Sequence, residues 1–152
     1  MTLIERLRQK GETLSAAESL TGGEIMSRVV SIPGASQVFF GGVVSYTDDI
    51  KHRILSVSEE SLARYTAVSA PVAEEMARGV AEKFGTSYGI SATGLAGPGG
   101  GTPEIPVGRV YIGLYHRGQV RSFCLNLTGD RQEIRKKSAD FALSVLEKEL
   151  TN

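Results

Sequence analysis

Apolar residues recur along the chain with two different spacings, and segments of the two kinds follow one another. Apolar residues three or four positions apart predict helices, and short runs of β-branched and aromatic residues predict strands. The helical spacing covers residues 3–10, 22–31, 51–55, 58–65, 69–85 and 130–149. The strand pattern covers residues 13–18, 37–46, 88–93, 107–116 and 119–127. Because helices and strands are interleaved, we expect an α/β fold in which helices cover a mixed β-sheet, as a single domain over residues 1–152.

Local signals mark several of these boundaries. Thr2 with Glu5, and Asp130 with Glu133, have the spacing of a capping box at the start of the first and last helices. Paired glycines interrupt the strand predicted over 37–46. Glycines inside a strand indicate a bulge, or a ligand that lies close to the backbone.

The segment 14–23 reads Leu-Ser-Ala-Ala-Glu-Ser-Leu-Thr-Gly-Gly and predicts a buried strand that turns sharply into a helix. Thr21 is expected to cap this helix, with Glu24 as the acid of a capping box. The turn would place Ser19 beside unpaired N–H groups at the positive end of the helix dipole, where an anion or a developing oxyanion is favoured. The two glycines that close the segment would let a substrate approach the backbone. The alternative is that Ser19 and Thr21 only cap the helix.

Composition excludes several classes of protein. Lysine plus arginine equal aspartate plus glutamate at 17 each, so the chain lacks the basic excess of nucleic-acid-binding proteins. Cys124 is the only cysteine, which excludes an internal disulfide and every multi-cysteine metal site, and its strand position predicts a buried thiol. No apolar run has membrane-spanning length and no leader is recognisable, so we expect a cytoplasmic protein without membrane contact.

A base for Ser19 has few candidates. His52 and His116 are the only histidines, and both are expected on the surface. Lys51 is the alternative, and it accepts a proton only if its pKa falls far enough to leave the amine neutral. Its position in the first turn of a helix disfavours an ammonium, whereas Asp48 and Asp49 stabilise one. An ordinary solvated helix lysine is the competing interpretation.

The segment 94–101 contains five glycines in eight residues, too many for regular structure. Consecutive glycines expose backbone N–H groups that form a nest for a phosphate or carboxylate. Thr93 and Thr102 flank the segment with hydroxyl groups. A mobile connector without a ligand is the alternative.

Four segments in chain order closely resemble the CinA C-terminal domain family, whose stand-alone members include nicotinamide-nucleotide amidase. They are Ala-Glu-Ser-Leu-Thr-Gly-Gly at 17–23, Tyr-Thr-Asp-Asp-Ile-Lys at 46–51, Ala-Val-Ser at 67–69 and Ala-Thr-Gly-Leu-Ala-Gly-Pro-Gly-Gly at 92–100. The resemblance covers residues 3–149. It implies hydrolysis of nicotinamide mononucleotide to nicotinate mononucleotide and ammonia, without metal or cofactor, in NAD recycling. It also implies a homodimer or larger homo-oligomer that binds a small nucleotide.

The resemblance assigns roles to individual residues. Ser19 matches the nucleophile and Lys51 the general base, with Tyr46 and Thr93 as supporting hydroxyl groups. The N–H groups at the start of the following helix would hold the oxyanion. The substrate-binding residues would be Thr21, Gly22, Gly23, Gly94, Gly97, Gly99, Gly100 and Arg131. Arg135 is a further source of positive charge near the phosphate.

Two departures from the family pattern bear on these roles. Leu20 stands where many relatives have cysteine, which favours serine as the nucleophile. Asp48 stands where relatives often have asparagine, which adds negative charge near the base and an anionic substrate. Two other functions are open at this point: a regulatory domain that senses a phosphorylated metabolite without turnover, and an amidase for a different carboxamide.

Overall fold

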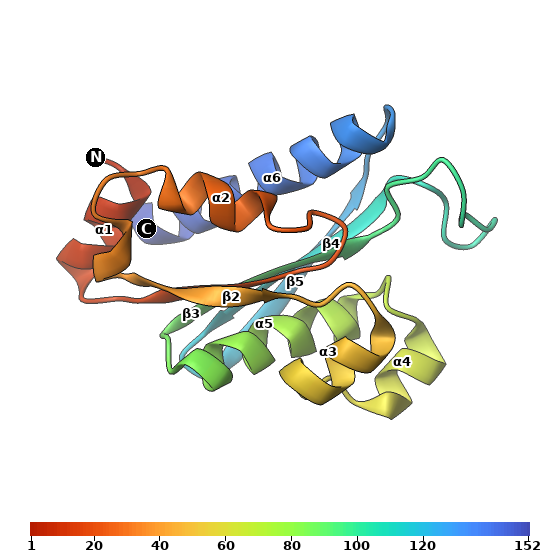
Figure 1. Cartoon of the computed structure of the whole chain (residues 1–152), viewed down its shortest axis with the longest axis horizontal. Coiled ribbons are helices and arrows are strands. Elements are labelled where there is room, and N and C mark those ends of the chain that lie inside the picture. The colour runs from red at the N-terminus through yellow and green to blue at the C-terminus, as the bar shows by residue number, and fades with distance from the viewer.

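The computed structural model describes all 152 residues, and Figure 1 shows helices on both faces of one five-stranded sheet. The strands are β1 (Leu14–Glu18), β2 (Phe39–Val44), β3 (Tyr88–Gly94), β4 (Arg109–His116) and β5 (Gln119–Asn126). The helices are α1 (Leu3–Lys10), α2 (Glu24–Val30), α3 (Asp48–Leu55), α4 (Glu59–Tyr65), α5 (Ala70–Phe84) and α6 (Arg131–Thr151), with a 3-10 turn over Ala35–Gln37. The predicted mixed α/β fold is confirmed.

The strand order in the sheet is β2-β1-β3-β4-β5. Strand β1 pairs in parallel with both β2 and β3, whereas β3, β4 and β5 form an antiparallel meander. The last two strands are the hairpin that the sequence predicts. Because β1 to β3 are parallel, their carboxyl ends meet at one edge of the sheet.

The core lies on both faces of the sheet. Helices α1, α2 and α6 cover one face, and α3, α4 and α5 cover the other (Figure 1). The larger cluster lies under the first group and includes Leu7, Ile25 and Leu146, none of which is exposed. The smaller cluster lies under α5 and includes Leu55 and Met76. Burial of these apolar side chains is the main force that holds the helices on the sheet.

The connections after β1 and β2 leave the sheet in opposite directions. Strand β1 leads into α2 on one face, and the adjacent strand β2 leads into α3 on the other (Figure 1). Such a switch point opens a crevice beyond the carboxyl ends of the strands, where ligands bind in open α/β sheets. The residues that follow β1, β2 and β3 therefore meet at one place.

The second strand is shorter than predicted and contains the bulge that its glycines indicate. It covers Phe39–Val44 instead of 37–46, because a 3-10 turn precedes it and Tyr46 lies beyond its end. Leu14 pairs with Phe39 and Ser15 with Gly41, so Phe40 is the extra residue. A Cβ atom on Gly42 would lie 2.1 Å from the carbonyl oxygen of Ala16, so a side chain there would prevent β1 and β2 from pairing.

Two further expectations are corrected. The helix predicted over 22–31 covers Glu24–Val30, because Gly22 and Gly23 have positive φ angles of 57° and 106° and belong to the turn. Cys124 is exposed instead of buried, because it lies on the edge strand β5 and no helix covers its side chain. None of the helices combines the length and the apolar composition that crossing a membrane requires.

Candidate active site

Ser19 is the first residue after β1, and the backbone on either side of it is fixed. Its N–H donates to the carbonyl of Ala92 at 2.9 Å, which extends the pairing between β1 and β3 by one residue. Its carbonyl accepts from the N–H of Gly22 at 3.1 Å, which closes a tight turn. The side chain is therefore held at the end of β1, which has a strand on either side, and it is 8% exposed.

Lys51 comes from α3 and reaches this serine. Its Nζ atom donates to Oγ of Ser19 at 2.9 Å and to the carbonyl oxygen of Ser45 at 2.7 Å. Thr47 caps α3 by accepting from the N–H of Ile50, which fixes the first turn that carries the lysine. Lys51 is 1% exposed, so the interpretation of a solvated helix lysine is wrong.

The surroundings of Lys51 favour its neutral form. Burial lowers the pKa of Lys51 below its ordinary value of 10.5, and the negative charge of Asp48 opposes that shift without cancelling it. No carboxylate lies within ion-pair distance of Nζ. A buried amine with no acidic partner is less costly to keep neutral than to protonate. The pair therefore has the geometry of a nucleophile with its base, in surroundings that lower the pKa of the amine.

A cavity of about 250 Å³ lies beyond the carboxyl ends of β1, β2 and β3 and contains this pair. It brings together the residues that follow these three strands, two residues between α4 and α5 (Ala67 and Val68) and the first residue of α6 (Arg131). Eight of the predicted site residues line it: Ser19, Tyr46, Lys51, Thr93, Gly94, Gly97, Gly99 and Arg131. Leu20 and Asp48 line it as well.

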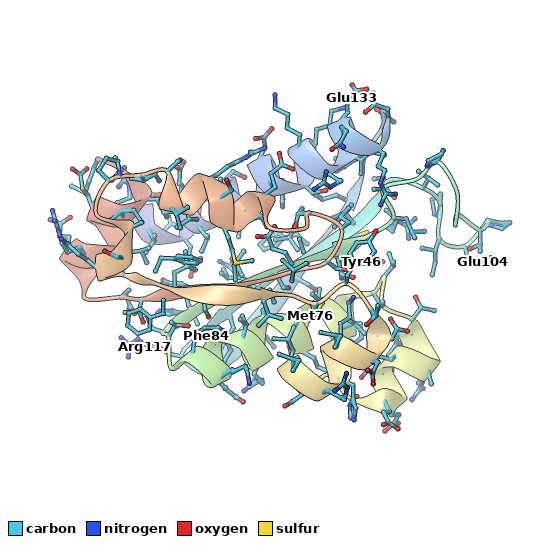
Figure 2. All side chains as sticks on the ribbon, viewed as in Figure 1. Tyr46, Met76, Phe84, Glu104, Arg117 and Glu133 are labelled. Carbon is cyan, nitrogen blue, oxygen red and sulfur yellow. The ribbon has the colours of Figure 1, made fainter.

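Arg131 joins the segments that follow β2 and β3 at the rim of the cavity. Its Nη1 atom donates to the carbonyl of Gly97 at 2.7 Å, and its Nη2 atom donates to the hydroxyl of Tyr46 at 2.9 Å. The loop between β3 and β4, residues 95–108, is called the glycine loop here. Figure 2 shows Tyr46 at the end of the sheet from which this loop projects, with Glu104 far out on it. Thr93 lies deeper, is 1% exposed, and donates its hydroxyl proton to the carbonyl of Ala67 at 2.8 Å.

Four predicted substrate-binding residues do not line the cavity. Thr21 is buried and its Oγ1 atom has no hydrogen-bond partner. Gly22 packs against Arg135, and Gly23 is the N-cap residue of α2. Gly100 lies on the exposed outer part of the glycine loop. The cavity thus takes its glycines from the base of the loop and from the end of β3, and none from the turn at 22–23.

The start of α2 also differs from the prediction. Thr21 does not cap this helix. The N-cap residue is Gly23, which has no side chain to accept a hydrogen bond from the first turn. Instead the buried carboxylate of Glu18 accepts from the N–H groups of Ile25 at 3.0 Å and Met26 at 2.9 Å. The N–H groups of Ile25 and Met26 are therefore occupied and are not free to hold an oxyanion. Sequence reasoning missed this cap because Glu18 precedes the turn, outside the local spacing of a capping box.

Neither the histidines nor the cavity beside the β4–β5 hairpin provides a comparable pair of side chains. His52 and His116 have side chains that are 41% and 32% exposed, and neither lines the cavity of Ser19. A cavity of about 430 Å³ beside the β4–β5 hairpin is lined by Arg117 and Arg121, which pair with carboxylates, and it contains no serine, threonine, cysteine or lysine. No group of three or more His, Cys, Asp or Glu side chains is placed to hold a metal ion.

Comparison with known proteins gives a consistent result over the whole chain. The family model of the CinA C-terminal domain matches residues 1–150. A CinA-like protein from Dictyoglomus thermophilum is 50% identical over 150 residues, which is 99% of this chain and 36% of that protein. A putative competence-damage inducible protein from Clostridium kluyveri is 48% identical over 144 residues, with 95% and 35% covered. The chain spans about a third of the length of these curated relatives.

Solved structures agree on the fold. The competence/damage inducible protein CihA from Agrobacterium tumefaciens superposes with a TM-score of 0.94 at 36% identity, covering 99% of this chain and 92% of that one. A CinA superfamily protein from Klebsiella pneumoniae 700603 gives 0.94 at 31% identity, with 98% and 93% covered. The arrangement of strands and helices that forms the cavity is therefore shared with these proteins.

Proposed function

The chain belongs to the CinA C-terminal domain family, and on this premise we propose that it is a serine amidohydrolase. The substrate is nicotinamide mononucleotide, which is hydrolysed to nicotinate mononucleotide and ammonia as a step of NAD recycling. The observation that carries the proposal is the buried contact between Nζ of Lys51 and Oγ of Ser19 at 2.9 Å. The same contact on the protein surface would not make Lys51 a base, because a solvated lysine stays protonated at neutral pH.

Burial is what makes the pair suited to catalysis. Lys51 and Glu18 are the only charged residue types among the buried residues, and Glu18 is bound to the start of α2. A neutral amine has one lone pair and two N–H bonds. In this form one N–H still donates to the carbonyl of Ser45, and the contact with Ser19 is reversed, so that the hydroxyl of Ser19 donates to the lone pair in place of accepting from Nζ. Lys51 is then placed to act as a general base, and burial lowers its pKa in the direction that this role requires.

The reaction has two steps, acylation of Ser19 and hydrolysis of the acyl-enzyme, and Lys51 is the base in both. Oγ of Ser19 attacks the carboxamide carbon while its proton passes to Nζ of Lys51, and the carbonyl oxygen becomes an oxyanion. The carbon–nitrogen bond then breaks, and the proton on Lys51 moves to the leaving nitrogen, which departs as ammonia. Water attacks the resulting ester, gives its proton to Lys51, and releases the carboxylic acid as Ser19 recovers its proton.

The opposite side of the cavity suits an anionic substituent such as a phosphate. Arg131 carries a positive charge at the rim. The N–H groups of Gly97 and Gly99 donate to no group of the protein and line the same cavity. An arginine with free backbone N–H groups is an arrangement that binds phosphate. The side chains of Tyr46 and Thr93 line the same cavity, and their hydroxyl groups would orient the rest of the substrate.

The test is ammonia release from nicotinamide mononucleotide by the purified chain, with a chelator present throughout. We expect turnover by the wild type and its loss in Ser19→Ala. Ser15→Ala is the matched control, because Ser15 is also a buried serine but lies within β1, bonds to Thr86 and does not line the cavity. Turnover that persists in Ser19→Ala would contradict the mechanism. No release by folded wild type, with thermal stabilisation by the nucleotide, would instead support a metabolite sensor.

A further inference from the structure

Arg135 grips the turn that follows the nucleophile. Its Nε atom donates to the carbonyl oxygen of Leu20 at 2.8 Å, and its Nη2 atom donates to that of Thr21 at 3.0 Å. One planar guanidinium group thus holds two successive carbonyls of the same turn. Gly22 makes this approach possible, since a Cβ atom there would lie 3.3 Å from Nη2 in a backbone with φ of +57°. Arg135 itself does not line the cavity, so its effect on the site passes through this turn.

Holding a carbonyl also fixes an N–H group. A trans peptide is planar, so the N–H of Thr21 points away from the carbonyl of Leu20 and therefore away from Arg135. The carbonyl of Ser19 is turned inward to accept from Gly22, so the N–H of Leu20 points outward from the turn. Both peptide units are thereby held in one orientation.

These two N–H groups are free. Neither the N–H of Leu20 nor that of Thr21 donates to any group of the protein, whereas the N–H groups of Ser19, Gly22 and Glu24 all have backbone acceptors. Glu18 accepts from the N–H groups of Ile25 and Met26, and the N–H of Gly23, which also has no acceptor, lies further along the chain. The free donors closest in the chain to Ser19 are therefore the two that immediately follow it.

We infer that Arg135 is a positioning residue, which aims the N–H groups of Leu20 and Thr21 at the oxyanion formed when Ser19 attacks its substrate. The inference rests on the proposed function, because it needs an oxyanion on the carbon bonded to Ser19. Oriented N–H donors stabilise the transition state more than the substrate, so their misalignment lowers kcat and leaves KM nearly unchanged. The positive charge of Arg135 also strengthens the N–H dipole of Thr21, whose peptide group it binds through the carbonyl of Leu20.

The kinetic test compares two arginines that both connect α6 to the α2 side of the sheet. Arg135→Lys keeps the positive charge but cannot donate to both carbonyls from one planar group. We expect kcat to fall about 10²-fold, and KM to stay within about twofold of the wild-type value. Arg28→Lys is the control, because Arg28 bonds Glu24 and Asp140 and does not touch the turn. Equal losses in both variants, or a loss that appears only in KM, would overturn the inference. Free guanidinium at a sub-denaturing concentration should restore part of the kcat of Arg135→Ala.

A second measurement does not depend on the natural substrate. An alkyl fluorophosphonate forms a bond between Oγ of Ser19 and phosphorus, releases fluoride, and places a phosphoryl oxygen where the oxyanion would lie. In ¹H–¹⁵N spectra of the wild-type adduct, we expect the amide protons of Leu20 and Thr21 to move downfield. The same shifts should be reduced in the Arg135→Lys adduct.

The two measurements separate the inference from the proposed function. Downfield shifts in an enzyme that releases no ammonia from nicotinamide mononucleotide would support the oxyanion site and overturn the proposed substrate. Active enzyme whose Leu20 and Thr21 amides do not move in the adduct would keep the amidase and overturn the inference. Thermal unfolding of each variant is the control for folding, and a midpoint well above the assay temperature is required for a loss of kcat to count.

Discussion

Asp48 lies one helical turn before Lys51 on α3, and both side chains line the same cavity. The carboxylate raises the pKa of the amine while burial lowers it more strongly. The protonation of the base is thus a balance between a desolvated environment and one nearby negative charge, and the charge is the part that a conservative substitution can remove.

Asp48→Asn is expected to move the acidic limb of the kcat/KM profile to lower pH. Without the carboxylate, the pKa of Lys51 falls further, so the neutral amine persists to lower pH. Asp49→Asn is the matched control, because Asp49 precedes the same lysine but pairs with Arg53 and does not line the cavity. A profile of Asp48→Asn that coincides with that of Asp49→Asn would count against Lys51 as the titrating base.

Lys51→Met should abolish turnover and change how stability depends on pH. Loss of the general base is expected to lower kcat at least 10²-fold. The lowered pKa means that the folded state binds fewer protons than the unfolded state between the folded pKa and 10.5. The free energy of unfolding of the wild type, relative to that of Lys51→Met, therefore increases as pH rises through this window. The difference becomes constant above pH 10.5. Urea unfolding of both proteins across the pH range measures the difference, and parallel curves would contradict a depressed pKa.

Arg131→Ala should raise KM for a phosphorylated substrate. A charged contact to phosphate contributes roughly 1.5–3 kcal/mol, which corresponds to a change in KM of about 10- to 100-fold. Nicotinamide riboside lacks the phosphate and serves as the internal control, since its hydrolysis should change much less. An equal loss with both substrates would assign Arg131 a role in holding Tyr46 and the glycine loop instead.

Glu18→Gln should destabilise the fold. The amide keeps one oxygen acceptor but turns an NH₂ group toward a backbone N–H of α2, which leaves a buried donor unsatisfied at a cost of about 1–3 kcal/mol. Glu24→Gln on the same helix is the control, because Glu24 is partly exposed and pairs only with Arg28. Chemical denaturation of the two variants gives the comparison. Equal midpoints would show that the carboxylate does not hold the start of α2.

Local sequence signals predicted the helix ends that depend on local contacts. The capping boxes of Thr2 with Glu5 and of Asp130 with Glu133 are confirmed, and the first and last helices begin where predicted. The cap of α2 was missed because it comes from Glu18, across a turn whose conformation depends on Gly22 and its contact with Arg135. Short-range spacing carries no information about such a contact.

The site shows the same division. The placement of candidate residues after strands could be read from the chain, but the meeting of Ser19 and Lys51 follows from the register of β1 with β2. Glu18 is opposite Val44 in that register, so the next residues, Ser19 and Ser45, begin the two connections side by side. The carbonyl that orients Lys51 belongs to the backbone of Ser45. Every residue has such a carbonyl, so the residue type at position 45 could not predict this contact. The resemblance to a known family supplied the pairing that local chemistry left open.

The two chain ends lie together at the end of the sheet opposite the cavity, where α1 meets the last turns of α6 (Figure 1). Tyr46 and the glycine loop lie at the other end (Figure 2). A polypeptide, surface anchor or fluorophore attached at either terminus would therefore leave the mouth of the cavity open. The proposed chemistry could therefore be assayed on a chain that is immobilised or tethered through either terminus, with the site unchanged.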